Sequence, residues 1–288
     1  MKKNNNNKHA FMIMARDADI NLRMLLKSLD HEDNDIYLHV DAKAGIIDTT
    51  GMVEKSSLKV CDRINVNWAA QSQVSAEMLL IKAVISENIE YKYIHLLSGN
   101  DLLIVDHDKF HNFFKNTNKQ FVDIESIDEK INVRRIKYYF PLQELVGKKH
   151  GVLWMLQKVL MYLQIVVGVN RKTSLYNHIA KGANWFSITL NCGIFILNKE
   201  KEINKYFSKG QSADELFLQT ILINSEYKND IINNNQRYTK WNKGENSPEI
   251  LTMNDLKSIE ESNKLIARKF DYKVSSNIMK KLTETGVD

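Results

Sequence analysis

The chain has 288 residues, 43% of them hydrophobic, and its 40 Lys and Arg against 35 Asp and Glu give a net charge of +5. A chain of this length and apolar content can bury a substantial core, and its modest positive excess excludes the dense basic surface of a nucleic-acid-binding protein. Its two cysteines, Cys61 and Cys192, lie far apart, which argues against a zinc site and a disulfide framework and suits a reducing compartment.

The first eight residues form a Lys/Asn-rich stretch without an apolar run. We expect a disordered tail at residues 1–8, with neither a secretory signal nor a membrane anchor, and therefore a cytoplasmic protein. No flexible linker or internal repeat divides residues 9–288, which we expect to form a single domain.

Strands and helices alternate in the first 125 residues. Apolar runs predict strands at residues 9–14, 35–40, 59–64 and 93–97. Helical spacing of apolar residues predicts a helix over 22–29 and another over 74–85, the second with Glu77 and Lys82 opposite its apolar side. This alternation predicts a largely parallel sheet with helices on both faces.

Charged residues follow three of these predicted strands: Arg16, Asp41 and Asp101. Ligands bind sheets of this kind outside the carboxyl ends of the strands. The three side chains are therefore expected to lie at a ligand-binding edge.

Residues 126–182 differ in kind from the first half, because they contain a basic, aromatic cluster and then a long apolar stretch at 152–169. Beyond them, two apolar segments at 185–190 and 193–197 predict a β-hairpin around Asn191.

Ser212, Ala213, Asp214 and Glu215 precede an apolar segment with helical spacing. This order predicts a capping box, with Ser212 as N-cap and Glu215 at the third helical position. A carboxylate fixed at a helix N-terminus also stays ionised, as the general base for a sugar hydroxyl must. Both interpretations stay open, since one residue can serve both purposes.

Arg268 and Lys269 are adjacent cations next to Phe270 near the end of the chain. They are either a solvated surface pair or a clamp for a diphosphate leaving group. In the second case Arg268 would bind the diphosphate with two parallel hydrogen bonds and Lys269 would act as a point charge.

Three Asp-x-Asp patterns occur, at residues 17/19, 33/35 and 106/108, and this spacing holds a divalent ion in many enzymes that use nucleotide sugars. Chance explains them better in a chain with so many Asp. The predicted strand at 93–97 leads to a single carboxylate, Asp101, which is a weak basis for a metal site.

The apolar stretch at 152–169 is close to membrane-spanning length, but Gln157, Lys158 and Gln164 interrupt it. With Trp154 and Tyr162 inside it and basic residues at both ends, it fits a helix lying in a membrane interface. A buried helix or a subunit contact is the alternative.

Taken in order, seven segments resemble the core-2/I-branching glycosyltransferase family (glycosyltransferase family 14), which includes β-1,6-N-acetylglucosaminyltransferases and peptide O-xylosyltransferases. Each segment alone is weak, and seven in the right order are specific. The segments are IYLHVDAK (36–43), NWAAQSQVSAEMLL (67–80), YIHLLSGNDLLI (93–104), GANWFSIT (182–189), SADELFLQTILINS (212–225), RYTKWNKGENSP (237–248) and ARKFD (267–271).

The resemblance implies an α/β fold of the GT-A type, with a mostly parallel sheet, residues 9–125 as the nucleotide-binding half and 126–288 as the acceptor-binding, catalytic half. It also implies inversion at the anomeric carbon, a UDP-sugar donor with GlcNAc favoured, and no metal or other cofactor. By position, Glu215 resembles the catalytic base, and Arg268 and Lys269 resemble the diphosphate clamp that replaces an ion.

Further site residues are implied in the same way. The nucleotide-binding set is Met14, Ala15, Arg16, Asp41, Trp68 and Ser72, and the donor and acceptor sugar pocket contains Asn100, Asp101, Trp185, Asp214 and Trp241. The tryptophan faces suit sugar stacking, with burial in the core as the competing explanation for each.

The chain departs from the family pattern at several positions. Ala69 and Ala70 stand where the family often has two glycines, and Glu249 stands where some members carry a basic residue, so part of the clamp is missing or comes from Lys243 or Arg237. The disulfides and membrane anchor of animal members are also absent from this sequence, which favours a bacterial, cytoplasmic relative.

The expected function is therefore transfer of a sugar to a glycan or lipid-linked saccharide in bacterial surface polysaccharide synthesis. If 152–169 lies in a membrane interface, the expected place is the inner face of the cell membrane. No nucleic-acid partner is expected. Two rivals stay open: a metal-dependent glycosyltransferase that uses an Asp-x-Asp pair, and a noncatalytic carbohydrate-binding protein of a polysaccharide assembly complex.

Overall fold

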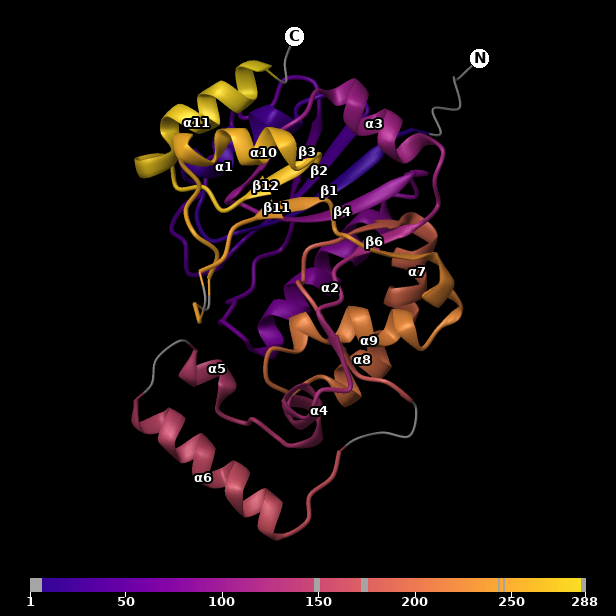
Figure 1. The fold of residues 1–288 in the computed structure, drawn as a ribbon, viewed down its shortest axis with the longest axis vertical. Coiled ribbons are helices and arrows are strands. Elements are labelled where there is room, and N and C mark those ends of the chain that lie inside the picture. Colours follow the sequence, from indigo (N-terminus) through magenta and orange to yellow (C-terminus); the bar gives the residue numbers. More distant parts are fainter. Residues whose placement is uncertain (1–6, 148–150, 172–175, 243, 246, 286–288) are drawn as a thin grey trace.

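A computed structural model describes residues 7–147, 151–171, 176–242, 244–245 and 247–285 (Figure 1). Most of the tail expected at 1–8 lies outside this range. Lys8 lies within it, and its Nζ is 2.7 Å from Oδ2 of Asp35.

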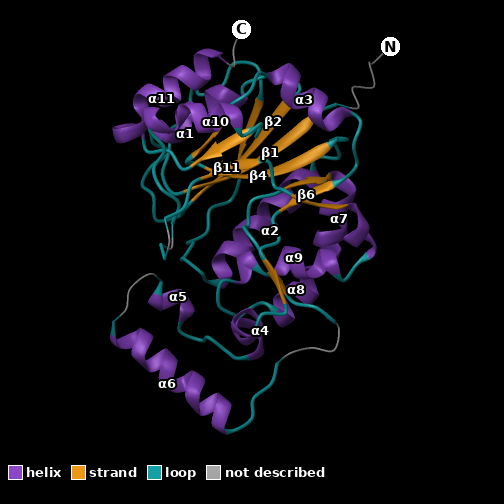
Figure 2. Ribbon diagram, viewed as in Figure 1, coloured by secondary structure: helices purple, strands orange, loops and turns teal. Residues whose placement is uncertain are grey.

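A seven-stranded sheet, in the order β10-β6-β9-β4-β1-β2-β3, forms the centre of the molecule (Figure 2). Its strands are β1 (His9–Ala15), β2 (Asn34–Val40), β3 (Ser57–Val60), β4 (Tyr93–Ser98), β6 (Gln120–Val122), β9 (Ser187–Thr189) and β10 (Ile231–Asn233). All neighbours pair in parallel except β9, which is antiparallel to both β4 and β6. The prediction of an α/β fold with a mostly parallel sheet is confirmed.

Helices cover both faces of this sheet, which is why its inner strands are continuous apolar runs. Phe11 and Ile13 of β1 pack with α1 (Ile20–Leu29) and α3 (His107–Lys115) in one buried cluster. Ala10 and Met12 point to the opposite face, towards α2 (Gln71–Ser86) and α7 (Leu190–Asn198). Successive residues of a strand face opposite sides, so one apolar run contributes to both clusters.

A smaller sheet joins a strand of the first half of the chain to two strands near its C-terminus. It contains β5 (Asp101–Leu103), β11 (Arg237–Thr239) and β12 (Ile266–Arg268), with β12 parallel to β11 and antiparallel to β5. In this register Arg268 lies opposite Asp101. Leu102 and Ala267 pack here beneath α10 (Leu256–Glu261) and α11 (Tyr272–Thr285).

Helices α4 (Lys130–Lys137), α5 (Gln143–Val146), α6 (Val152–Val166), α8 (Glu200–Tyr206) and α9 (Phe217–Ile223) lie in the lower half of Figure 1. The other short elements are β7 (Ser126–Ile127), which pairs with β8 (Ala180–Lys181), and the 3-10 helices η1 (Ala213–Glu215), η2 (Glu226–Asp230) and η3 (Met253–Asp255). Among the described residues, none of the helices combines the length and the apolar character that crossing a bilayer requires.

The hairpin predicted around Asn191 is wrong. The first segment forms β9, but Leu190–Asn198 is helix α7, whose N-cap Thr189 accepts a hydrogen bond from the backbone N–H of Cys192. Cys192, Gly193 and Ile196 face the core from this helix. Because nearly every residue of the segment is apolar, its sequence fits the strand period and the helix period equally well.

The capping box predicted at Ser212 is also wrong. Ser212 has a left-handed backbone (φ 49°) and its side chain caps nothing, while its N–H donates to the carbonyl of Ala69 at 2.9 Å. Residues 213–215 form η1, and the longer helix begins only at Phe217. A tertiary contact therefore replaces the local cap.

Candidate active site

Polar groups gather at the carboxyl ends of β1, β2 and β4, as the sheet topology predicts. The backbone N–H of Asp41 donates to Ala15 O at 2.9 Å, and that of Gly99 donates to Met14 O at 3.0 Å. A Cβ on Gly99 would lie 3.0 Å from the Cβ of Ala15, which shows how closely the end of β1 and the turn after β4 approach each other. Met14, Ala15 and Asp41 of the expected nucleotide site are thus brought together.

Two charged residues at this edge have different surroundings. Asp41 is 7% exposed, and its carboxylate accepts the N–H of Lys43 at 2.9 Å and pairs with the Lys43 ammonium at 3.2 Å. Arg16 is exposed and pairs with its neighbour Asp17 at 3.1 Å.

Asp101 and Arg268 form a buried ion pair beside Trp185. Asp101 is fully buried, accepts Arg268 Nε at 3.0 Å and accepts the N–H of Ser98 at 3.0 Å. The Arg268 guanidinium lies over the Trp185 ring, 4.5 Å from its centroid. Burial raises the pKa of Asp101, while the nearby Arg268 charge opposes that shift.

The two segments that carry Asp101 and Arg268 are also tied through their backbones. The N–H of Phe270 donates to Asn100 O at 2.9 Å, and the Asn100 amide donates to Phe270 O at 3.0 Å. Lys269, between Arg268 and Phe270 in the chain, is half-buried, and its Nζ lies 3.4 Å from Ser247 Oγ. Three family-like segments, 93–104, 237–248 and 267–271, therefore meet at one place.

Arg237 does not belong to a clamp in this arrangement. It is 4% exposed, and its terminal nitrogens donate to Ser187 Oγ and to the carbonyls of Leu96 and Phe186. Burial lowers the pKa of its guanidinium to about 9. Lys243, the other residue considered for the clamp, lies outside the described residues. Glu249, which stands where some family members have a basic residue, pairs with Lys240 at 2.9 Å.

Glu215 lies at the end of η1 with its side chain 36% exposed. Its Oε2 is 3.0 Å from Arg135 Nη1 and 3.9 Å from Lys181 Nζ. Its backbone carbonyl accepts the N–H of Gly182 at 3.0 Å.

The segment 182–185 connects Glu215 to Arg268. Gly182 is bonded to the Glu215 backbone, and Trp185, three residues later, stacks on Arg268. Three residues span at most about 11 Å. The geometry therefore places the expected base and the expected clamp on opposite ends of one short segment.

Two buried acids lie behind Glu215. Burial, and then the charge of Glu215, raises the pKa of Asp214 to about 7. Burial, and then Asp214, raises the pKa of Glu77 well above its usual value. The expectation that Glu77 faces away from the core is wrong. Glu77 lies three residues after Val74 and four before Ile81, a helical spacing that puts all three residues on the buried side of α2.

The other expected site residues are less closely connected. Trp68 and Trp241 are 39% and 55% exposed. Ser72 is the second residue of α2, where its Oγ lies 2.8 Å from Glu144 Oε2 and its N–H donates to Glu144 Oε1 at 2.9 Å. The Glu144 carboxylate of α5 thus occupies the N-terminus of α2, a place that attracts anions. No pattern in the sequence indicates this contact.

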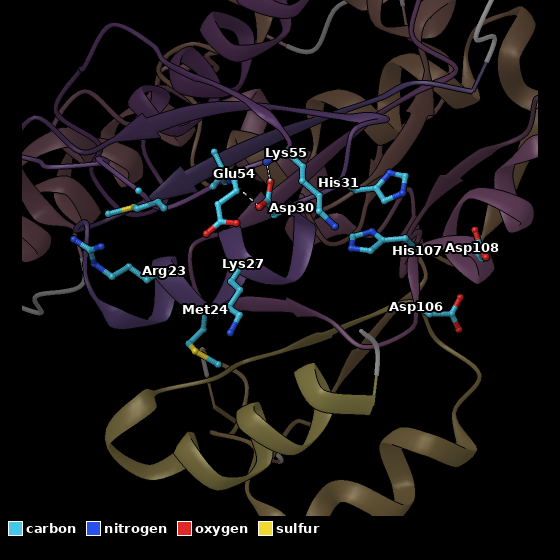
Figure 3. Close-up of a pocket in the computed structure, with 13 residues that line it drawn as sticks. Arg23, Met24, Lys27, Asp30, His31, Glu54, Lys55, Asp106, His107 and Asp108 are labelled. Carbon is cyan, nitrogen blue, oxygen red and sulfur yellow. Dashed lines mark hydrogen bonds between the residues drawn. The ribbon is translucent and has the colours of Figure 1, made fainter. Parts of the chain in front are cut away.

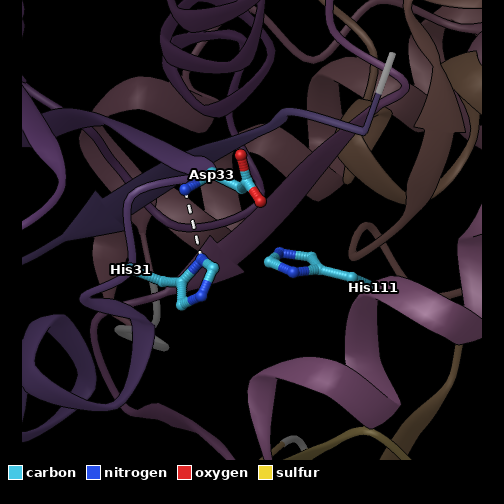
Figure 4. A group of neighbouring side chains, drawn as sticks. All are labelled: His31, Asp33 and His111. Carbon is cyan, nitrogen blue, oxygen red and sulfur yellow. Dashed lines mark hydrogen bonds between the residues drawn. The ribbon is translucent and has the colours of Figure 1, made fainter. Parts of the chain in front are cut away.

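A group that could hold a metal lies elsewhere: His31, Asp33 and His111, whose candidate ligand atoms all lie within 4.8 Å of one another (Figure 4). It adjoins a pocket of about 760 Å³ lined by His31, His107, Asp30 and others (Figure 3). Both lie near the amino end of β2, whereas Asp41 follows its carboxyl end, and seven residues of strand measure about 20 Å. An ion held here would not touch a nucleotide at Asp41.

The Asp-x-Asp carboxylates have structural contacts. Asp19 and Asp106 cap α1 and α3, and Asp35 accepts the Tyr91 hydroxyl at 2.6 Å and pairs with Lys8. Asp17 pairs with Arg16. These contacts favour the chance origin of the spacing.

Comparison with known proteins gives a family match. The family model described as "Branch: Core-2/I-Branching enzyme" matches residues 9–263, a range that ends before Arg268 and Lys269. No curated protein matches the chain. Among solved structures, mouse xyloside xylosyltransferase 1 in its apo form is 10% identical, with 81% of this chain and 88% of that chain covered and a TM-score of 0.36.

Proposed function

The chain belongs to the core-2/I-branching enzyme family of glycosyltransferases, and on that premise we propose that it transfers a sugar from a UDP-sugar to a carbohydrate hydroxyl, with inversion and without a metal. We propose GlcNAc as the transferred sugar, after the β-1,6-N-acetylglucosaminyltransferases of the family, with xylose as the sugar of its other members. The proposed setting is surface polysaccharide synthesis on the cytoplasmic side of a bacterial membrane.

One observation carries the proposal: segment 182–185 joins the backbone of Glu215 to the Trp185 ring that stacks on Arg268. Inverting transfer needs a base on one side of the anomeric carbon and a stabilised leaving group on the other. A carboxylate and a guanidinium held by one short segment meet that need.

In the proposed reaction, Glu215 takes the proton of the acceptor hydroxyl as its oxygen attacks the anomeric carbon. The bond from that carbon to the diphosphate breaks on the opposite face, and UDP leaves with the electron pair. Arg268 and Lys269 stabilise the charge that grows on the diphosphate. Arg135 holds one carboxylate oxygen of Glu215, and within the described residues the other accepts no hydrogen bond, which suits it to receive the proton.

The remaining nucleotide contacts are proposed from position and geometry. Asp41, with backbone at Met14 and Ala15, is placed to meet the uridine and ribose, near Arg16, Trp68 and Ser72. Asn100, Asp101, Trp185, Asp214 and Trp241 are proposed around the two sugars. Ser72 is engaged by Glu144, so donor binding at this point requires that contact to open or to be bridged.

The test is release of UDP from a panel of UDP-sugars by the purified protein, with and without EDTA. Hydrolysis of one donor at an equal rate in both supports a metal-independent transferase. Activity that disappears in EDTA and returns with Mn²⁺ would favour the metal-dependent rival, and no donor turnover across the panel would favour a noncatalytic binding protein.

A further inference from the structure

Helix α6 turns its two glutamines inward and most of its apolar residues outward. Gln157 accepts the N–H of Leu142 at 3.0 Å and donates to Gln143 at 2.8 Å, and Gln164 exchanges two hydrogen bonds with the backbone of Tyr139. The opposite side exposes Val152, Met155, Leu156, Val159, Tyr162, Leu163 and Val166, each by 45% or more. A water-facing helix has the reverse pattern, so this face is built for an apolar surrounding.

The position of α6 fits a surface contact. It lies at the lower end of the molecule in Figure 1, farthest from α10 and α11. Its Trp154 and Tyr162 are residue types that favour the interface between lipid and water. Lys158 on α6 and Arg134 on α4 add positive charge, which complements an anionic bilayer rather than a second copy of the same cationic surface.

A pocket of about 360 Å³ lies between α4 and α6. Its charged lining is Arg134, Arg135 and Lys158, and it contains no carboxylate. Within the described residues, neither Arg134 nor Lys158 has an ion-pair partner, although the Lys158 ammonium lies 3.5 Å from the centroid of the Trp154 ring. The pocket lining thus carries three cations and no acid, and of the three only Arg135 pairs with a carboxylate of the described chain, that of Glu215 outside the lining, so the pocket suits an anion.

The rest of the pocket wall is apolar. Phe140, Trp154, Met161 and Ile131 line it beside the cations. A site with one charged side and one apolar side selects an amphiphile over a free anion. Its Arg135 also reaches Glu215, with 3.0 Å between Nη1 and Oε2.

We propose that the α4–α6 pocket binds the phosphate and the first part of the apolar chain of a membrane-embedded lipid phosphate, on which the acceptor sugar is carried. The outer face of α6 lies in the lipid surface and brings the pocket to its ligand. Arg135 then connects the bound phosphate to the base, so the sugar beyond the phosphate reaches Glu215. This inference rests on the proposed function for the role of Glu215, and binding itself can be measured without turnover.

The pocket is tested by binding of dodecyl phosphate below its micellar concentration, with inorganic phosphate and dodecyl maltoside as comparison ligands. We expect dodecyl phosphate to bind at least about ten-fold more tightly than either, and the Arg134→Gln/Lys158→Gln double variant to lose about ten-fold of that affinity. The matched control removes two exposed lysines elsewhere, Lys109→Gln/Lys280→Gln, and keeps wild-type binding. Equal affinity for all three ligands, or equal loss in both double variants, would overturn the pocket assignment.

The outer face is tested by co-sedimentation with phosphatidylcholine vesicles, with and without phosphatidylglycerol. Val159→Gln/Leu163→Gln should reduce the bound fraction several-fold on the anionic vesicles, whereas Ile46→Gln/Val274→Gln, which changes exposed apolar residues outside α6, should not. Unchanged binding in the α6 variant, or conversion of a dimer to a monomer by it, would refute the lipid contact. UDP binding measured on each variant separates these outcomes from a failure of the proposed function, which would remove UDP binding from the wild type as well.

Discussion

Arg268 Nε lies 3.0 Å from Oδ1 of Asp101, although 167 residues separate the two in the chain. The pair is formed by the antiparallel register of β12 and β5, and Asp101 is fully buried. A buried carboxylate that fixes one nitrogen of a guanidinium orients the rest of that group. The finding therefore gives a physical reason for Asp101, which the family resemblance placed in the sugar pocket without a stated role.

Asp101→Asn should lower the free energy of unfolding by about 3 kcal/mol, because it leaves the largely buried Arg268 without its counter-charge. It should also weaken UDP binding, since the guanidinium loses its orientation. Denaturant unfolding and UDP titration measure both effects. The double variant Asp101→Asn/Arg268→Gln should cost less than the sum of the two single changes, and strict additivity would show that the pair is not coupled.

Glu215→Gln should reduce turnover by about 1,000-fold while UDP affinity stays within about two-fold of the wild type. The amide cannot accept the acceptor proton, whereas nothing in the diphosphate clamp changes. Initial rates and UDP calorimetry provide the two readouts. Glu260→Gln, at an exposed position of α10, is the control, and a Glu215→Gln enzyme with ordinary turnover would remove Glu215 from the mechanism.

The sequence predicted β1, β2, β4, α1 and α2 well, because their apolar residues recur with one clear period and polar loops separate them. The strand predicted at 59–64 lies at 57–60, and β5, α3 and β6 were not predicted. The prediction failed at Leu190–Asn198, where an almost wholly apolar segment fits both periods and only the Thr189 cap and the core decide for the helix. It failed at Ser212 because the contact that determines the backbone there comes from Ala69, far away in sequence.

The candidate site shows the same limit. Family resemblance indicated Glu215 and Arg268, but no local pattern could indicate that Trp185 stacks on Arg268 or that Arg135 pairs with Glu215. Both contacts depend on the tertiary fold. The burial of Glu77 could have been predicted from the sequence, because helical spacing puts this residue among apolar ones, where an acid is unexpected.

Replacing Glu77 should remove one contribution that lowers stability as the pH rises. In the unfolded chain carboxyl groups lose their protons near pH 4, whereas burial keeps Glu77 protonated to a much higher pH and Asp214 to about pH 7. The folded state therefore binds more protons in this interval, and these two groups destabilise it as the pH rises from about 4 through 7.

Melting temperatures of Glu77→Gln and wild type, compared from pH 5 to pH 8, measure this effect. Relative to the wild type, the variant should gain stability as the pH rises. The difference is the proper readout because buried histidines such as His9 and His95, whose pKa values burial lowers, act in the opposite direction in both proteins. A difference that is constant with pH would show that Glu77 does not titrate abnormally.

Chelation of divalent ions should leave sugar transfer unchanged. The carboxylates of Asp17, Asp19 and Asp35 are engaged in a helix cap or in ion pairs, and positive side chains lie where the leaving diphosphate is proposed to bind. If a metal nevertheless co-purifies, His31→Gln/His111→Gln should remove it without loss of turnover, because that group lies about one strand length from Asp41. Turnover that follows the metal content would contradict the proposed chemistry.

Gly182→Ala should be among the most damaging single changes in the chain. A Cβ at this position would lie 1.7 Å from the carbonyl oxygen of Asp123, so the backbone of one segment must move. Because Gly182 also donates to the Glu215 carbonyl and leads to Trp185, the movement would displace the base relative to the clamp. We expect a loss of several kcal/mol in unfolding free energy and at least about a 100-fold loss of turnover in the fraction that folds.

Gly45→Ala is the matched control, since a Cβ there meets no atom within 4 Å and the backbone needs no positive φ. If Gly182→Ala had the same unfolding free energy and the same turnover as the Gly45→Ala control, segment 182–185 would not be what fixes the base relative to the clamp.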